Sequence, residues 1–141
     1  MKTNKFLTVL VLLAVALTFA AGCKKRSPLD EEKKAAQIIK QKILGRWNLT
    51  DFIEETKKAD GSVEVVDNDP KNVYFEFFAN DKGKTNAEGE EEFTYKMKAN
   101  NVLMLWESQQ NIVELTDNKL TFKNTTTSQG ITYTQTYYLT R

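Results

Sequence analysis

From Gly45 onward the chain is a succession of short segments in which apolar and polar residues alternate, and the segments are separated by residues that favour turns. In one of the clearest segments, Phe93, Tyr95 and Met97 alternate with polar residues. A period of two residues is typical of a β-strand with one buried and one solvated face. The sequence predicts strands over residues 46–55, 62–66, 73–79, 84–87, 91–98, 102–106, 111–116, 119–126 and 131–141.

Short turns, such as those at Asp60-Gly61 and Glu88-Gly89, connect these segments. No helix-length segment separates two strands, so the pattern favours antiparallel pairing through hairpins. A meander of this kind leaves exposed edges unless it closes on itself. The predicted fold class is therefore all-β, a small antiparallel up-and-down β-barrel of about eight strands.

One short helix is predicted in front of the barrel. Ser27 can cap it, Pro28 suits its first position, and Gly45 can end it. Residues 35, 38, 39, 43 and 44 form one apolar stripe at helical spacing. We expect this stripe to pack against the barrel rather than against a partner.

The first residues have the pattern of an export signal. Lys2 and Lys5 precede an apolar run over residues 6–21, which is shorter than the roughly 20 residues of a transmembrane helix. The run ends in Ala-Ala-Gly-Cys at residues 20–23, which resembles the bacterial lipobox. The resemblance implies cleavage before Cys23 and attachment of lipid, including palmitate, to that residue. An ordinary secretory signal that leaves a free thiol is the alternative.

Three parts follow from this interpretation: a signal peptide over 1–22, a segment over 23–44 with the lipidated Cys23, a basic tether and the helix, and the barrel over 45–141. Two or more acyl chains would anchor the protein stably in a membrane. The basic residues at 24–26 could meet anionic headgroups, although a solvated spacer fits equally well. The expected location is the cell envelope, with the outer membrane favoured and the periplasmic or surface face left open.

The composition argues against several function classes. The chain has no His and one Cys, which excludes Ser-His-Asp triads, Cys-His pairs, His-ligated metal sites and intramolecular disulfides. Its 20 basic and 19 acidic residues give no reason to expect nucleic-acid binding. The acidic residues at 88 and 90–92 lack the ligand spacing of a calcium loop. We therefore expect no enzymatic activity, no metal and no cofactor.

Gly45-Arg46-Trp47 follows the predicted helix and opens the first strand, and Arg141 lies on the last strand. This arrangement resembles the lipocalin superfamily, in which a Gly-x-Trp opens the first strand and an Arg stacks on that Trp to close the barrel. Residues 95–105 and 112–122 are similar to hairpins of bacterial lipocalin-like lipoproteins. The resemblance implies barrel closure by Trp47 and Arg141, and a small hydrophobic ligand inside the barrel.

Candidate ligand-binding residues are the large apolar side chains expected to face the barrel interior. They are Trp47, Phe75, Phe77, Tyr95, Met104, Tyr133 and Tyr137, and Met97, Trp106 and Phe122 are further candidates for the interior. A barrel of about eight strands holds either packed side chains or one small ligand. Both possibilities predict the same residues, so the sequence leaves a solid core open.

The rival hypothesis is an interaction module. In this interpretation the barrel is solid, and its outer face or end loops dock another envelope protein or a surface glycan. Exposed aromatic residues such as Tyr74, Phe78 or Tyr138 would then carry the contact.

Overall fold

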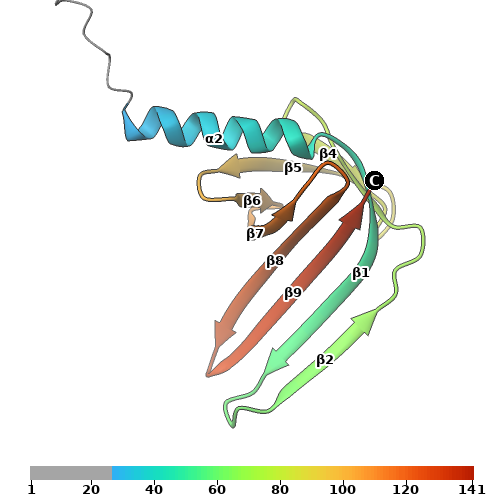
Figure 1. The fold of residues 1–141 in the computed structure, drawn as a ribbon. Helices are drawn as coiled ribbons and strands as arrows, with labels where there is room; N and C mark the ends of the chain where they lie inside the picture. The colour runs from blue at the N-terminus through green and yellow to red at the C-terminus, as the bar shows by residue number, and fades with distance from the viewer. Residues whose placement is uncertain (1–26) are drawn as a thin grey trace, which may run out of the picture.

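The computed structural model describes residues 27–141. The predicted signal segment, Cys23 and the basic residues at 24–26 lie outside the described residues. The described elements are α2 (Pro28–Ile43), β1 (Gly45–Lys57), β2 (Val63–Asn68), β3 (Tyr74–Phe77), β4 (Lys82–Thr85), β5 (Glu91–Lys98), β6 (Val102–Leu105), β7 (Ser108–Leu115), β8 (Lys119–Ser128) and β9 (Ile131–Thr140) (Figure 1).

The strands form a closed antiparallel barrel. From β3 to β9 each strand pairs with the next, and β1 closes the ring by pairing with both β3 and β9. Strand β2 pairs with the far half of β1 and is not part of the ring. The ring therefore contains eight strands, β1 and β3 to β9. This confirms the predicted all-β up-and-down barrel of about eight strands preceded by one helix.

Strands β2 and β3 are two parts of one strand that is interrupted in the middle. Asn48 pairs with Tyr74 and Phe52 pairs with Asn68, so this strand uses two more residues than β1 over the same length. The extra residues lie at 69–73, where Asn72 has a positive φ of 59°. The ladder resumes at the hydrogen bond of 2.9 Å from the Leu49 amide to the Val73 carbonyl. The chain between the two strands therefore bulges out without changing direction.

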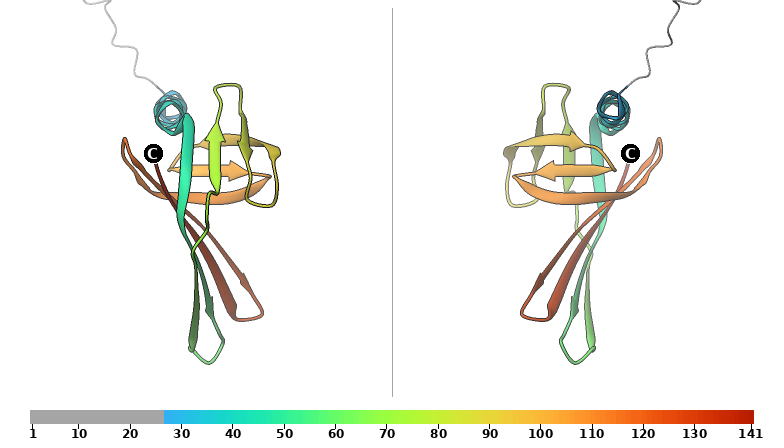
Figure 2. Two further views of the ribbon diagram at one scale, coloured as in Figure 1. Left: turned by 90° about the vertical axis from the view of Figure 1, so that its right-hand side faces the viewer. Right: turned by 90° about the vertical axis from the view of Figure 1, so that its left-hand side faces the viewer.

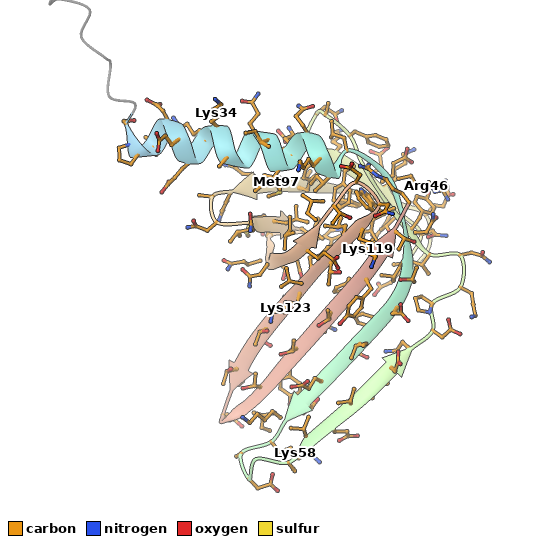
Figure 3. The ribbon with its side chains drawn as sticks, in the orientation of Figure 1. Lys34, Arg46, Lys58, Met97, Lys119 and Lys123 are labelled. Carbon is orange, nitrogen blue, oxygen red and sulfur yellow. The ribbon has the colours of Figure 1, made fainter. Side chains whose placement is uncertain are left out.

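Four strands continue beyond the barrel as an extension made of β1, β2, β8 and β9. Pairing between β1 and β9 runs on to Lys57 and Thr132, and pairing between β8 and β9 runs on to Ser128 and Ile131. The two hairpins project side by side away from α2 (Figure 2). Lys58 marks the far tip of this extension, whereas Met97 lies beneath α2 (Figure 3).

Helix α2 lies across the end of the barrel that holds the β3–β4 and β5–β6 connections (Figure 1). The Ser27 hydroxyl accepts a hydrogen bond of 3.3 Å from the Asp30 amide, which confirms the predicted cap. Ile43 is fully buried in the core and Ile39 packs against it. Lys40 fixes the helix by an ion pair of 2.5 Å with Asp81. Within residues 27–141, no helix has the length and hydrophobicity needed to cross a membrane.

The barrel is solid beneath α2. Trp47, Phe77, Leu103, Leu120 and Leu139 all bury essentially their whole side chains there. We call this packed end the base of the barrel. Such a layer leaves no room for a ligand.

Two polar or small residues complete the base. The Phe93 ring packs directly on Gly83. A larger residue does not fit there, because an added Cβ would lie 2.4 Å from the Phe93 Cζ atom. The Tyr95 hydroxyl donates a hydrogen bond of 2.7 Å to the Phe78 carbonyl. Burial, and then the charge of Asp81, raise the pKa of Tyr95 to about 12, so its hydroxyl stays protonated.

Candidate functional site

A cavity of about 360 Å³ lies at the end of the barrel away from α2. This end holds the β4–β5 and β6–β7 connections, and the extension rises beside it. The volume lies in the lower part of the range that small-molecule sites occupy. The lining residues are Phe75, Ala87, Glu88, Glu91, Leu105, Trp106, Gln110, Phe122 and Tyr137.

Aromatic rings form the inner wall of this cavity. The Phe122 and Tyr137 rings are stacked with centroids 4.9 Å apart, and the Phe75 ring meets Phe122 edge-on at 6.0 Å. Phe52 extends the stack, with its centroid 4.7 Å from that of Tyr137. Each ring is held in place by its neighbours, so the wall is preformed for an apolar ligand.

Gln110 is a buried polar residue in the lining of the cavity. It pairs with Leu103 on β6 and is only 7% exposed, because its place in the β7 alternation turns it inward. Its side-chain Oε1 is buried and accepts no hydrogen bond within the described part of the chain. A buried acceptor without a donor costs about 1–3 kcal/mol. A ligand that donates a hydrogen bond to this oxygen would remove that cost.

Trp106 stands at the mouth of the cavity in a strained conformation. Trp106 and Glu107 form the two-residue turn between β6 and β7, with φ angles of 44° and 67°. Positive φ is unfavourable for a bulky residue and is found where other requirements impose it. The Trp106 side chain is 45% exposed. The centroid of its ring lies 5.0 Å from that of the Phe93 ring and 6.4 Å from that of the Phe75 ring. The turn thus holds an indole half in the cavity and half in solvent.

Carboxylates surround the same mouth. Glu88 and Glu91 line the cavity from the β4–β5 connection and the start of β5. Glu54 on the extension accepts hydrogen bonds of 3.1 Å from Gln135 and 3.3 Å from Asn68. Burial first, and then the charges of Glu54 and Glu88, raise the pKa of Tyr137. The phenol of Tyr137 therefore lies within the field of two carboxylates, Glu88 of the cavity lining and Glu54 of the extension.

The structure separates the seven predicted ligand-binding residues into groups. Phe75 and Tyr137 line the cavity. Trp47, Phe77 and Tyr95 face inward but are buried in the base, away from the cavity lining. Of the further interior candidates, Trp106 and Phe122 line the cavity and Met97 is in the core.

Two predicted ligand-binding residues need correction. Met104 pairs with Lys96 on the outer face of the barrel, because Leu103 and Leu105 are the residues of β6 that turn inward. Tyr133 is on the same face of β9 as the inward residues Tyr137 and Leu139. It lies in the part of the strand that extends beyond the barrel, however, and its side chain is 45% exposed. Neither residue reaches the cavity.

Sequence reasoning missed Leu105, Gln110, Ala87 and the two glutamates of the lining. Gln110 gives no signal of its own, because a single polar residue in a strand is usually solvated. The sequence shows only that Glu88 and Glu91 lack the spacing of a calcium loop, and their position over an apolar cavity depends on the closed barrel. Within residues 27–141, no group of three or more Asp, Glu, His or Cys side chains is arranged to hold a metal ion.

Trp47 and Arg141 meet at the base. The Arg141 guanidinium lies 4.1 Å from the centroid of the Trp47 ring, and the Trp47 Nε1 donates a hydrogen bond of 2.8 Å to the Ile43 carbonyl. Arg141 also donates to the carbonyls of Leu44 at 2.8 Å and Asp117 at 2.7 Å. One side chain thus joins the end of α2, the first strand and the β7–β8 turn.

The comparison with protein families identifies this architecture. The family model of the lipocalin-like domain matches residues 43–122, which is more than half of the chain. No curated protein and no solved structure gives a significant match. The matched residues begin at the end of α2 and reach the cavity wall at Phe122. The chain belongs to the lipocalin-like domain family.

Proposed function

We propose that this protein is a lipid-anchored lipoprotein of the cell envelope that binds a small hydrophobic ligand in the cavity at the open end of its barrel. A lipocalin-like barrel suggests hydrophobic ligand binding in general. The observation that carries the proposal is the aromatic cavity of about 360 Å³ above a solid base. The proposed role is binding rather than catalysis, since a chain without His can form neither a Ser-His-Asp triad nor a Cys-His pair.

The anchoring part of the proposal rests on the sequence. The apolar run at 6–21 ends at the one Cys of the chain, Cys23, and basic residues follow at once. Intact-mass measurement of the protein from the membrane fraction is expected to show a chain that begins at Cys23 and carries acyl groups. A Cys23→Ser variant serves as the control. An unmodified chain in the soluble fraction would contradict lipid anchoring and leave the cavity unaffected.

The binding part predicts a specific role for Trp106. In residues 24–141 prepared without lipid, Trp106→Ala should weaken binding of the neutral probe N-phenyl-1-naphthylamine about tenfold, because an aromatic wall of the cavity is lost. The free energy of unfolding should change by less than about 1 kcal/mol, since the side chain is half exposed and its backbone is strained. Fluorescence titration and denaturant unfolding measure the two quantities.

Val113→Ala is the matched control for Trp106→Ala. Val113 is also an exposed apolar residue, but it lies on the outer surface and does not line the cavity. Its replacement should leave probe binding unchanged. If both variants bind the probe as well as the original protein does, the probe binds elsewhere and the proposed cavity is not the site.

A second candidate function, docking of another envelope protein, is favoured by one observation on the extension. Among the strands of residues 27–141, β2 pairs only with β1, and its Val63, Val65 and Val66 are about half exposed. An open strand edge can pair with a strand of a partner, which favours a protein over a glycan here. Of the three aromatic residues expected to be exposed, Tyr138 is exposed, Phe78 is half-buried, and Tyr74 is buried beneath Arg46.

Site-specific crosslinking tests this second function. A photo-crosslinking residue at Val63 is expected to give a discrete protein adduct in cells, and Val65→Lys should abolish that adduct because a charged edge blocks strand pairing. A crosslinker at Lys119, at the base end of β8, serves as the control. Equal labelling from both positions, or labelling that persists in Val65→Lys, would argue against docking at β2.

A further inference from the structure

Three polar side chains of the cavity favour a ligand that donates hydrogen bonds and carries positive charge: Gln110, Glu88 and Glu91. Gln110 presents a buried Oε1 that has no donor within the described residues. The side chain is more than nine-tenths buried and lines the cavity. A buried acceptor without a donor is unfavourable, so a ligand that donates a hydrogen bond to Gln110 would be favoured.

The charged side chains at the mouth of the cavity are acidic. Glu88 and Glu91 line the cavity, and none of the described lining residues is a Lys or Arg. Within residues 27–141, neither carboxylate forms a salt bridge, whereas the neighbouring Glu92 lies 3.8 Å from Lys84. Burial first, and then the charges of Glu54 and Glu88, raise the pKa of Tyr137 beside them. A carboxylate ligand, such as a fatty acid, would meet these charges without a counter-ion.

The walls suit a cation as well as an apolar body. The rings of Phe75, Trp106, Phe122 and Tyr137 surround the space. Aromatic faces attract cations through the ring quadrupole, and the attraction grows when the cation is desolvated. Trp106, held half in solvent at the mouth, lies beside the carboxylates where a charged group would enter.

We propose that the ligand is a small amine, whose ammonium group lies between Gln110 and the carboxylates of Glu88 and Glu91 while its apolar or aromatic body packs against the rings. The inference rests on the proposed function, because it specifies the ligand class of the same cavity. The N–H donors satisfy Gln110, and the positive charge meets the acidic mouth. A ligand with a hydroxyl group could donate to Gln110, but it would carry no positive charge for Glu88 and Glu91.

Three probes that share a phenyl ring and differ in charge test the inference. They are 2-phenylethylamine, 2-phenylethanol and phenylacetate, titrated by calorimetry into the full-length protein in lipid nanodiscs, with empty nanodiscs subtracted. At low salt the amine should bind about tenfold more tightly than the alcohol, because two solvent-exposed charge pairs add a modest attraction. Phenylacetate should be the weakest, and added salt should reduce the advantage of the amine.

Variants assign these differences to residues. Glu88→Gln with Glu91→Gln should bring the affinity for the amine to within about threefold of that for the alcohol. The matched control is Glu90→Gln with Glu92→Gln, which removes the same charge from adjacent positions that do not line the cavity. Gln110→Leu should weaken both the amine and the alcohol about tenfold by removing the shared acceptor. The carboxylate variants are surface changes, so the test does not depend on Gln110→Leu folding.

The outcomes separate this inference from the proposed function. If the alcohol or phenylacetate binds as tightly as the amine, or if the two double variants behave alike, the amine inference is overturned and a hydrophobic-ligand site stands. If none of the three binds while N-phenyl-1-naphthylamine does, the inference is likewise overturned. If N-phenyl-1-naphthylamine also fails to bind, the proposed function itself fails.

Discussion

Replacing Trp47 with alanine is expected to lower the free energy of unfolding by about 4 kcal/mol, which is a large share of the stability of a small domain. The Trp47 side chain is fully buried at the base, beneath α2. Its removal leaves a cavity that the packed neighbours cannot fill, and it leaves the Ile43 carbonyl without the hydrogen bond from Nε1. Urea unfolding followed by circular dichroism measures the loss.

Trp47→Phe is the control for this prediction. Phenylalanine keeps most of the packing but cannot donate to Ile43, so it should cost about 1–2 kcal/mol. A Trp47→Ala variant that unfolds at the same urea concentration as the original protein would show that the base is not the stabilising core. Loss of probe binding without loss of stability would instead place Trp47 at the ligand.

The second large effect is expected at Arg141. Arg141→Ala should cost about 2 kcal/mol, because one guanidinium both covers the Trp47 ring and donates to the carbonyls of Leu44 and Asp117. The Leu44 carbonyl lies just past the last turn of α2, where carbonyls have no partner within the helix and a positive charge is favourable. We therefore expect α2 to separate from the barrel more readily in this variant.

Two variants distinguish hydrogen bonding from charge and stacking. Arg141→Lys keeps the charge but loses the planar fork, so it should recover little of the lost stability. Arg46→Ala removes a guanidinium that lies 3.7 Å from the centroid of the Tyr74 ring and forms no side-chain hydrogen bond within the described residues. It should cost less than about 1 kcal/mol. An Arg141→Lys variant as stable as the original protein would show that the carbonyl contacts of the guanidinium contribute nothing.

Local patterns predicted the fold well where a strand has one dry and one wet face. Phe93, Tyr95 and Met97 alternate in the sequence and are all inward on β5. Ser27 and Pro28 placed the start of α2 because capping is decided by neighbouring residues. The interruption between β2 and β3 escaped prediction, because it depends on register with β1 and not on local composition.

The same physical reasons explain the errors at the site. Strand β6 is apolar on both faces, so no alternation in the sequence indicates which way Met104 points, and the inward residues are its neighbours. Tyr133 has the right parity, but no local feature shows where β9 leaves the barrel. Gln110 and Glu91 become site residues only when β5, β6 and β7 are paired in register around a common cavity. The cavity is formed by the pairing of strands that are far apart in the sequence, and the residue types alone do not predict it.

The most direct test of the account is native mass spectrometry of residues 24–141 after exposure to an extract of cell-envelope small molecules and lipids. The account predicts a discrete added mass that is lost on denaturation and reduced in Trp106→Ala, while Val113→Ala retains it. A folded protein without added mass, with Trp106→Ala and the original protein indistinguishable, would contradict the claim that the cavity binds a small ligand.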